Sequence, residues 1–570
     1  MMISTAKQGM AQNNFREAGY WLDKTVDQLL NEAIARTPDK IAIIADRADR
    51  EQALRLTYRE LGNLVDRAAS SLSRLGVGPR DVVTVQLPNW WEFVVAALAC
   101  SKIGAVFNPV MPILRERELL YVLNFCESKV FIVPKVYRGF DYAAMAAGMS
   151  GDLYHLKHLI VVDGDGDSSF ERSLLAAEPG RVSAKSAGSS PCLGPDDMAV
   201  VMFTSGTTGE PKGVIHTSNS LVGCTKALTQ RFGLLNNEVL LVASPVAHMT
   251  GYAAVVLLSI YLGGTMVLQD VWEPKRGVSL MVREGVTYTA ASTPFLNDIC
   301  DVVAAGAPRP ASLRSFLCAG ATIPPVLIQR AARDVGIHAC SLWGMTESLA
   351  STLTEPSRAA EKSPTTDGRP LEGMEIRIVD FDGKPVPLGQ SGRLLVRGCQ
   401  MFTGYYKKPE LETFDAQGWF DSGDLAYMDD EGYIRISGRV KDVLIRGGEN
   451  VPVVEIENLL YKHPAVAAVA VVGYPDARLG ERGCAFIIPK PGNTIDLAAM
   501  QAYLAECKMA KQFWPERVEL VADLPRTASG KIQKFKLKEI AAAFPKQSSG
   551  ASAASGSGGD QRPKSRRLER

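Results

Sequence analysis

The sequence predicts an α/β protein with a large N-terminal domain, built from several subdomains, and a smaller α+β C-terminal domain. Three observations lead to this fold class. Helical and strand-like segments alternate from about residue 56 to residue 344, the alternation restarts in compact form at residue 453, and a glycine- and charge-rich stretch, 437–450, lies between. Such alternation is typical of α/β domains, and a chain of 570 residues is too long for a single core.

The large domain is expected to span residues 1–440. Residues 58–77 repeat apolar side chains at helical spacing, 81–88 read as a short strand, and 91–110 read as an apolar helix that leads into another strand. Short apolar runs then predict strands at 158–164, 198–203, 264–270, 315–321 and 338–344. This succession continues the α/β pattern through most of the domain.

The C-terminal domain is expected to span residues 441–546. It begins with a helix at 453–464, followed by strands at 466–475 and 482–490, a helix after Asp496 and a strand near 517–522. Residues 547–570 are rich in Ser and Gly and lack apolar side chains, which predicts a disordered tail. Contact of its basic end with an acidic partner is the alternative to a solvated tail.

Composition narrows the class of function. The 63 basic and 62 acidic side chains nearly cancel, so no overall field attracts nucleic acid or anionic lipid, and a small-molecule substrate is the better expectation. The ten cysteines form no C-x-x-C pair and no cluster with histidine, which indicates reduced thiols in a cytoplasmic protein. We find no secretory h-region and no run of roughly 18 apolar residues, so neither secretion nor membrane insertion is expected.

The stretch "VMFTSGTTGEPKGV", residues 201–214, suggests a phosphate cradle. A strand ends near Phe203, a glycine-rich turn follows, and a helix begins with Thr217 or Ser218 as its N-cap. Backbone N–H groups, with the side chains of Thr204, Ser205, Thr207, Thr208 and Lys212, could bind the phosphates of a nucleotide triphosphate. A Walker A loop is excluded, because Pro211 precedes the lysine and Gly213 stands where the metal-binding hydroxyl belongs. Taken alone, the stretch also fits an ordinary surface loop.

This segment resembles the phosphate-loop signature of the adenylate-forming superfamily, which includes acyl-CoA synthetases, aryl-CoA ligases, peptide-synthetase adenylation domains and luciferases. Five further matches follow in the family's order: "PVAHMTG" from Pro245, "CAGATIPP" from Cys318, "WGMTES" from Trp343, "GWFDSGDLAYMDDEGYIRISGRVKD" from Gly418 and "PRTASGKIQK" from Pro525. The chain is therefore identified as a member of this family over about residues 20–545.

The resemblance implies an AMP-forming ligase whose substrates are ATP, a small carboxylic acid and coenzyme A, with Mg²⁺ at the phosphates. It implies that Thr346 binds the α-phosphate, Glu347 holds Mg²⁺, Trp343 lies against the adenine, and Asp424, assisted by Arg439, binds the ribose hydroxyls. It further places Gly320 and Ala321 beside the adenine, and Thr204, Ser205, Gly206, Thr207, Thr208, Gly209 and Lys212 at the phosphates.

Each of these motifs has a plain structural alternative when it is considered alone. "WGMTES" also fits a helix N-terminus capped by Thr346, with a core tryptophan. Asp424 also fits a turn, and Arg439 also fits a surface ion pair.

Lys531 in "TASGKIQK" is implied to bridge the substrate carboxylate and the α-phosphate from the small domain. In the family this mobile domain rotates after adenylation, so Lys441 matches the hinge, and Gly447 and Gly448 of "RGGEN" match the wall of a tunnel for pantetheine. A plain flexible linker is the alternative for this region.

His248 matches a catalytic position near the acyl carboxylate and the thiol entry, with a hydrogen-bonded core histidine as the alternative. Two residues depart from the commonest family pattern. Ala247 replaces an aromatic residue before the histidine, which widens the acyl pocket or the thiol passage. Trp343 replaces tyrosine, which keeps the stacking surface and loses a phenol.

The acyl substrate is expected to be a neutral, hydrophobic acid. The segments implied to form its pocket, 248–254, 287–295 and 315–322, contain apolar and small residues, and 248–254 has no acidic residue to bind an amino group. The chain is most similar to cyclohexanecarboxylate-CoA and medium-chain acyl-CoA ligases, so alicyclic, medium-chain and simple aromatic acids are candidates, the first slightly favoured. Loading of a separate carrier protein, luciferase-type oxidation and a non-catalytic nucleotide-binding role are the alternatives, and a homodimer stays open.

Overall fold

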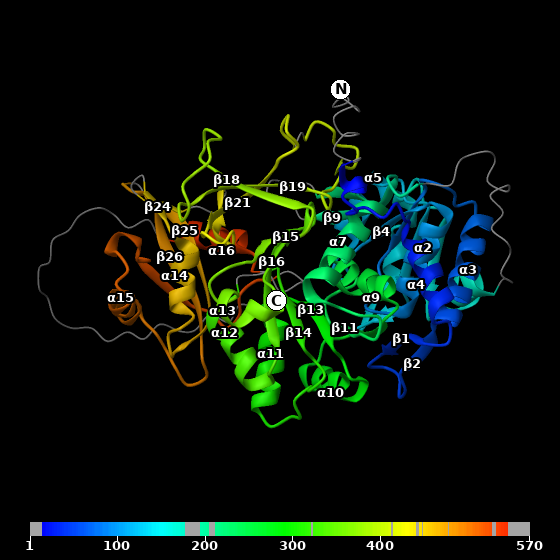
Figure 1. Ribbon diagram of the computed structural model, residues 1–570, viewed down its shortest axis with the longest axis horizontal. Coiled ribbons are helices and arrows are strands. Elements are labelled where there is room, and N and C mark those ends of the chain that lie inside the picture. Colours follow the sequence, from blue (N-terminus) through cyan, green and yellow to red (C-terminus); the bar gives the residue numbers. More distant parts are fainter. Residues whose placement is uncertain are drawn as a thin grey trace, which may run out of the picture.

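The computed structural model describes residues 14–176, 194–204, 211–320, 323–411, 414–440, 444–446, 449–476, 478–526 and 532–544. The chain forms a large α/β domain and a smaller C-terminal domain, shown in orange and red in Figure 1. The predicted fold class is confirmed. Among the described residues, none of the helices combines the length and the apolar character that are needed to cross a lipid bilayer.

The first sheet of the large domain has the strand order β20-β10-β9-β4-β3-β5-β8. The pairs from β9 to β8 are parallel, whereas β9–β10 and β10–β20 are antiparallel. Its strands are β3 (Val82–Val85), β4 (Val106–Pro109), β5 (Val130–Pro134), β8 (His158–Val162), β9 (Met198–Thr204), β10 (Lys212–Thr217) and β20 (Gly404–Tyr405). The short hairpin of β6 (Val136–Tyr137) and β7 (Phe140–Asp141) lies outside this sheet.

The second sheet has the order β17-β16-β15-β14-β13-β11-β12-β1-β2. Its central strands are parallel, and antiparallel pairs complete both edges. The strands are β1 (Ile41–Asp46), β2 (Leu54–Thr57), β11 (Val239–Val242), β12 (Thr265–Gln269), β13 (Tyr288–Ala291), β14 (Ser315–Cys318), β15 (His338–Met345), β16 (Leu349–Leu353) and β17 (Arg369–Pro370).

The helix α4 (Trp91–Ile103) is apolar on every side, and its residues Phe93–Cys100 are buried. A helix of this kind belongs in the interior, and one continuous core joins it to β3 and β11 of the two sheets. The other helices of the large domain are α2 (Val26–Arg36), α3 (Tyr58–Arg74), α5 (Glu116–Phe125), α6 (Tyr142–Gly148), α7 (Ser218–Phe232), α8 (Met249–Gly251), α9 (Leu258–Leu262), α10 (Pro274–Glu284), α11 (Thr293–Ala304), α12 (Pro325–Arg330) and α13 (Ala359–Lys362). Short 3₁₀ or π turns are η1 (Ser150–Asp152), η2 (Gly166–Ser168), η3 (Glu171–Leu175), η4 (Tyr252–Leu257), η5 (Ala331–Val335) and η6 (Pro356–Arg358).

A third, antiparallel sheet completes the large domain and leads toward the small one. It consists of β18 (Met374–Val379), β19 (Gly392–Gly398), β21 (Phe420–Met428) and β22 (Ile434–Arg439), in that order. In Figure 1 this sheet lies between the first sheet and the orange domain. It therefore carries Asp424 and Arg439 toward the small domain.

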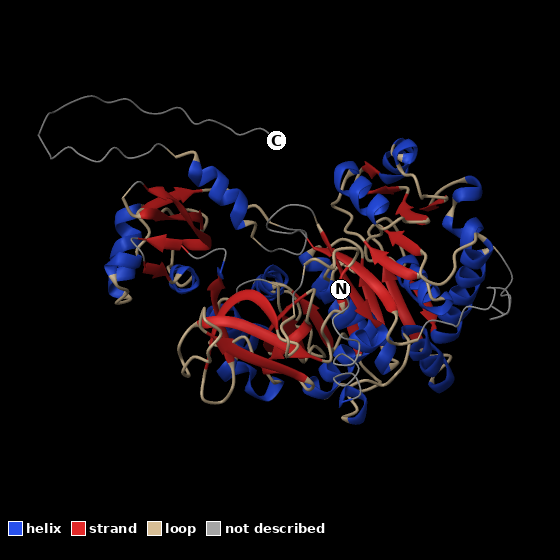
Figure 2. Cartoon of the chain, turned by 90° about the horizontal axis from the view of Figure 1, so that it is seen from above, coloured by secondary structure: helices blue, strands red, loops and turns tan. Residues whose placement is uncertain are grey.

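The small domain forms a separate lobe in Figure 2. Its sheet contains β23 (Leu444–Arg446), β24 (Glu449–Val451), β25 (Val466–Asp476), β26 (Gly480–Pro489) and β27 (Arg517–Leu520). Side chains of β25 alternate between two cores, as a strand requires: Val469 and Val471 join one, and Ala468, Ala470 and Val472 join the other. The helices α14 (Val453–Leu460) and α15 (Leu497–Glu506) contribute to the first core, α16 (Lys534–Ala542) contributes to the second, and η8 (Lys511–Phe513) is a 3₁₀ turn.

The helices and strands predicted by residue range are present, and the structure adds others, of which one changes the description of the phosphate-loop segment. The sequence predicts a loop that runs from Phe203 directly to a helix, but the structure inserts β10, which returns antiparallel to β9 before α7 begins. Thr217 is the N-cap of α7, because its hydroxyl accepts the N–H of Ser220. The phosphate-loop segment therefore joins two strands of a hairpin.

Candidate functional site

Asp424 lies at the centre of a buried polar arrangement on β21. Its Oδ1 accepts a hydrogen bond from Arg439 Nε at 2.8 Å, and its Oδ2 accepts one from the indole N–H of Trp343 at 2.8 Å. The Asp424 side chain is 5% exposed, and its strand pairs it with Arg439 across the β21–β22 ladder. The turn alternative for Asp424 is therefore wrong. Each carboxylate oxygen has a second lone pair, so the group can still accept from a diol.

Thr346 and Glu347 occupy the tight turn between β15 and β16. The alternative of a helix N-terminus is therefore wrong, because the flanking strands form an antiparallel pair. A Cβ at Gly344 would lie 1.9 Å from the carbonyl oxygen of Leu349, so only glycine permits this close approach. Leu349 itself has a left-handed φ of 52°, which shows how strongly the turn is constrained.

The carboxyl group of Glu347 is buried and accepts a hydrogen bond from the phenol of Tyr405 at 2.9 Å on Oε1. Burial raises its pKa, against the opposing effects of the Tyr405 hydrogen bond and of the positive charges of Lys212 and Arg439. Among the described residues, no Lys or Arg lies within ion-pair distance of it. A buried carboxylate without an ion-pair partner would be stabilised by a bound hard cation, and carboxylate oxygens are the ligands that Mg²⁺ prefers. The Glu347 side chain therefore fits a Mg²⁺ ligand.

A buried histidine, His216 on β10, supports the same turn. Its Nε2 donates to the carbonyl oxygen of Thr346 at 2.6 Å, and its Nδ1 lies 3.0 Å from Ser220 Oγ. Burial lowers the pKa of His216 to about 4, so the imidazole is neutral near pH 7 and carries its proton on Nε2.

The residues that flank the phosphate loop, Thr204 at the end of β9 and Lys212 at the start of β10, are paired at the base of the β9–β10 hairpin. Lys212 Nζ lies 4.9 Å from the centre of the Tyr405 ring, within the range of a cation–π contact. Because Tyr405 also contacts Glu347, this hairpin connects the loop to the acidic side chain. Ser205, Gly206, Thr207, Thr208 and Gly209 lie outside the described residues.

His248 is half-buried at the N-cap of α8, where its Nδ1 accepts the N–H of Thr250 at 3.2 Å. The residues before it are fixed by Asn89, whose amide nitrogen contacts the carbonyl oxygens of Val242 and Ser244 at 3.1 Å and whose Oδ1 accepts the N–H of Val246 at 2.9 Å. Ala247 is 3% exposed and packs in the central core. These hydrogen bonds hold the backbone segment that leads from β11 to His248.

A cavity of about 1340 Å³ extends between the two domains. The large domain contributes Gly320, Trp343, Asp424 and Arg439 to its wall, and the small domain contributes Glu457, Arg526, Ile532, Gln533 and Lys534. Gly320 has a φ of 82°, a left-handed conformation that glycine tolerates best. The structure thus brings these predicted nucleotide-binding residues of the large domain to one cavity with the segment that directly follows Lys531.

Comparison with known proteins agrees with this geometry. The family described as AMP-binding enzyme matches residues 30–406, and the family described as AMP-binding enzyme C-terminal domain matches residues 455–531. The chain belongs to the AMP-binding enzyme family. This is the class of AMP-forming acid–thiol ligases, so the resemblance inferred from the six motifs is confirmed.

Two relatives and one crystal structure illustrate the range of the AMP-binding enzyme family. The chain is 34% identical over 528 residues to a medium-chain fatty-acid–CoA ligase of Escherichia coli strain K12, covering 92% of each chain. It is 34% identical over 537 residues to a salicylyl-CoA synthase / salicylate adenylyltransferase of a Streptomyces species, covering 93% of this chain and 96% of that one. The crystal structure of the anthranilate CoA ligase AuaEII in complex with anthranoyl-AMP superposes with a TM-score of 0.81 at 26% identity, covering 91% and 98%.

Four further residues predicted for the AMP-binding enzyme site, Ala321, Lys441, Gly447 and Gly448, lie outside the described residues, as does Lys531. Their roles stay predictions. For Lys531 the structure describes the residues on either side: Arg526 and Ile532 form an antiparallel bridge, so the two ends of the segment that contains Lys531 lie close together.

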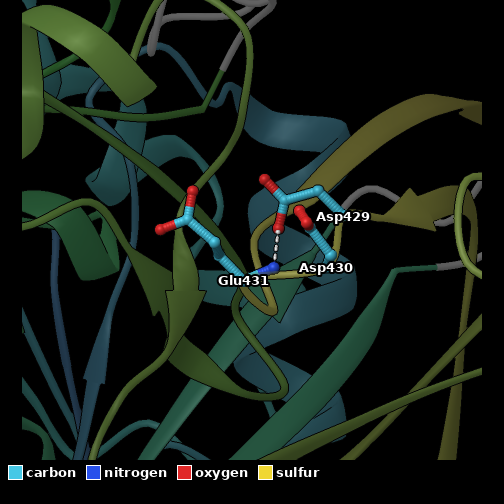
Figure 3. A group of neighbouring side chains, drawn as sticks. All are labelled: Asp429, Asp430 and Glu431. Atoms are coloured by element: carbon cyan, nitrogen blue, oxygen red, sulfur yellow. Dashed lines mark hydrogen bonds between the residues drawn. The ribbon is translucent and has the colours of Figure 1, made fainter.

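The structure also groups three acidic residues, Asp429, Asp430 and Glu431, at the turn between β21 and β22 (Figure 3). Asp429 Oδ1 accepts the N–H groups of Glu431 and Tyr433, so it shapes the turn. Lys362 Nζ lies 3.1 Å from Asp429 Oδ2, and hydrogen bonds from Arg358 and Lys362 lower the pKa of Glu431 to about 2. The group therefore forms an ion-pair network, distinct from the site around Glu347.

Sequence reasoning missed three residues that organise this site: His216, Tyr405 and Asn89. Each acts through a hydrogen bond to a segment far away in the chain, which no local pattern reports. Two had a usable signal, since a histidine in the apolar strand segment "GVIHT" and an asparagine at a strand end in "QLPNWW" are both expensive to bury without partners.

Proposed function

We propose that the protein is an ATP-dependent acid–CoA ligase that activates a hydrophobic carboxylic acid through an acyl-adenylate. The observation that carries this proposal is the cavity between the domains. It combines a carboxylate that can bind a diol, Asp424, an aromatic ring, Trp343, and the segment 532–534 that directly follows Lys531. This set suits adenosine and a reacting carboxylate together.

In the proposed first half-reaction, an oxygen of the substrate carboxylate attacks the α-phosphorus of ATP and pyrophosphate leaves. Both reactants are anions, so positive charge must lie between them. Lys531 supplies an ammonium group, Lys212 and the hydroxyl of Thr204 contact the phosphates, and Thr346 binds the α-phosphate. Mg²⁺, held by Glu347, would neutralise further negative charge on the phosphates.

In the proposed second half-reaction, the thiol of CoA attacks the acyl carbonyl carbon, the bond to the phosphate oxygen breaks and AMP leaves. Rotation about Lys441 would carry Lys531 away and bring Gly447 and Gly448 to the pantetheine arm. In this proposal His248, on the large domain, would orient the carboxylate in the first step and face the thiol in the second.

The acyl group is proposed to be alicyclic, medium-chain or simple aromatic. The supporting observation is the apolar and small character of the residues around His248: Ala247 directly before it, and Ala253 and Ala254 after it, are all buried. One relative is named as a medium-chain fatty-acid–CoA ligase and another is named for salicylate, an aromatic acid, so both kinds of acid occur among the relatives' names. Because no acidic side chain occurs in 248–254, an amino acid is not expected as the substrate.

Loading of a separate carrier protein is a second candidate, favoured by a relative in Mycobacterium tuberculosis, 34% identical over 528 residues, that is named salicyl-AMP ligase / salicyl-S-ArCP synthetase. Product analysis separates the two. Purified protein is incubated with Mg²⁺ATP and pooled alicyclic, linear and aromatic acids, with and without CoA, and the products are identified by mass spectrometry. An acyl-CoA formed only with CoA supports the ligase and names its acid. Acyl-adenylate without any thioester points to a carrier protein.

A further inference from the structure

The strand β10 lies between two parts of the proposed active site. Its first residue, Lys212, closes the base of the phosphate-loop hairpin, and its last residue, Thr217, caps α7. Residues 212, 214 and 216 share one face of the strand, because side chains alternate with a period of two. This places Lys212 and His216 on the same side of β10.

We infer that His216 is a positioning residue that couples β10 to the turn carrying Thr346 and Glu347. Its imidazole is fully buried and spans two segments, with Nε2 donating to the carbonyl oxygen of Thr346 at 2.6 Å and Nδ1 facing Ser220 Oγ at 3.0 Å. Nothing in the proposed chemistry requires it to touch a substrate. Its effect on the reaction passes through the backbone of Thr346.

The turn is held at two successive carbonyl groups. His216 binds the carbonyl oxygen of Thr346, and the N–H of Phe402 donates to that of Glu347 at 2.8 Å. The Glu347 side chain is then oriented by the phenol of Tyr405. Because Thr346 and Glu347 are adjacent in one short turn between the constrained residues Gly344 and Leu349, we expect loss of one anchor to shift the Thr346 hydroxyl and the Glu347 carboxyl together.

The two ends of β10 reach this turn by separate routes. Lys212 contacts the Tyr405 ring, which binds the Glu347 side chain, whereas His216 binds the backbone of Thr346. Backbone pairing of β10 with β20 ties these routes together, because Val214 is paired with Tyr405 and the N–H of Thr403 donates to Ile215. A displacement of the phosphate-loop hairpin is thereby transmitted to the residues proposed for the α-phosphate and the cation.

The test compares two substitutions at one position. His216→Leu fills the buried volume without a hydrogen bond, and His216→Gln retains an N–H that can reach the Thr346 carbonyl. His158→Leu is the matched control. His158 lies on β8 of the same sheet, away from the site, and its Nε2 also bonds a backbone carbonyl, that of Leu75 at the end of α3. Adenylation is followed by ATP–pyrophosphate exchange over a range of Mg²⁺ concentrations, and thioester formation is followed from supplied acyl-adenylate.

We expect His216→Leu to reduce the adenylation rate by about 10- to 100-fold and to raise the Mg²⁺ concentration for half-maximal rate, as is usual when a supporting hydrogen bond is lost. His216→Gln should recover part of both effects. Thioester formation should change less than about twofold. An unchanged Mg²⁺ dependence in His216→Leu, or an equal effect of His158→Leu, would overturn the inference. If His216→Leu fails to fold, His216→Met, which also fills the volume without an N–H donor, takes its place and is judged by the same criterion.

The inference rests on the proposed roles of Thr346 and Glu347, so Glu347→Gln is measured alongside. An unaltered Mg²⁺ dependence in Glu347→Gln would reject the cation-binding role itself. A shifted dependence in Glu347→Gln, with none in the His216 variants, would reject only the positioning role of His216.

Discussion

The indole N–H of Trp343 donates to Asp424 Oδ2, on the carboxylate oxygen opposite the one bound by Arg439. The aromatic side chain proposed to contact the adenine, Trp343, is therefore hydrogen-bonded directly to the acidic side chain proposed to bind the ribose, Asp424, which lies 81 residues later in the chain. A tyrosine at position 343 would present a different donor geometry. Trp343 thus donates a hydrogen bond that orients the carboxylate proposed to bind the ribose.

Trp343→Phe keeps an aromatic ring and removes this donor. A hydrogen bond to a charged group contributes about 1.5–3 kcal/mol, so we expect the KM for ATP to rise roughly tenfold or more, with a smaller change in kcat. Steady-state kinetics with varied ATP measure the effect. Trp419→Phe is the control, because the Trp419 indole N–H is buried without a hydrogen-bond partner in the described part of the chain. A similar rise in the control would show that the effect is structural.

Lys531→Ala tests whether Lys531 is needed for adenylation and not for thioester formation. Adenylation should be abolished, because the positive charge between the two anions is lost, while thioester formation from supplied acyl-adenylate should be largely spared. Pyrophosphate exchange and acyl-CoA formation are measured separately. Lys536→Ala, an exposed lysine on α16, should behave like the unmodified protein. Equal loss of both half-reactions in Lys531→Ala would contradict its assigned role.

Tyr405→Phe tests the electrostatics of Glu347. Burial already raises the pKa of Glu347, and the Tyr405 hydrogen bond acts in the opposite direction by stabilising the carboxylate. Removing the phenol should therefore raise this pKa further, so that the ionised form is gained only at higher pH. The acidic limb of the adenylation rate, recorded at low Mg²⁺, should move to higher pH. Tyr406→Phe changes a neighbouring phenol and should leave the limb in place.

Asn89→Ala tests how the loop before His248 is held. The Asn89 amide makes four buried hydrogen bonds to the backbone, to Val242, Ser244, Val246 and Gln269. Leaving such groups unpaired costs about 1–3 kcal/mol each, so we expect the free energy of unfolding to fall by at least about 2 kcal/mol. Denaturant unfolding measures it. The exposed Asn493→Ala should stay within about 0.5 kcal/mol, and an equally small effect at Asn89 would contradict the reading.

Much of the fold follows from the sequence because it depends on local patterns. The apolar helix α4, the strands β3, β4, β8, β9, β12, β14 and β15, and the new run of helices and strands from Val453 all follow from periodicity. Of the residues named by the family motifs, the structure brings Trp343, Asp424 and Arg439 to the wall of the cavity between the domains, and their roles there stay predictions. The strand β10 was missed because its glycine and lysine resemble a loop, and only pairing with β9 and β20 makes it a strand.

The residues that support the 346–347 turn, His216 and Tyr405, could not be predicted either, because they too depend on contacts between distant segments of the chain. His216 and Tyr405 contact the 346–347 turn from positions 130 residues before it and 58 residues after it. Such contacts are decided by how sheets pack, which is a property of the whole domain. The Trp343–Asp424 hydrogen bond likewise needs the third sheet to dock against β15.

The pairing of β10 with β20 also bears on biosynthesis. The first sheet takes nearly all its strands from the first 217 residues, but its last strand is Gly404–Tyr405. During translation this edge of the sheet therefore waits until almost two hundred further residues have been made, and domains generally fold as units while the chain emerges. Because Tyr405 both closes the sheet and binds Glu347, the turn proposed to hold the cation gains this support only when the edge of the sheet is completed. A nascent chain that stops short of residue 405 carries the phosphate-loop hairpin with one edge still unprotected.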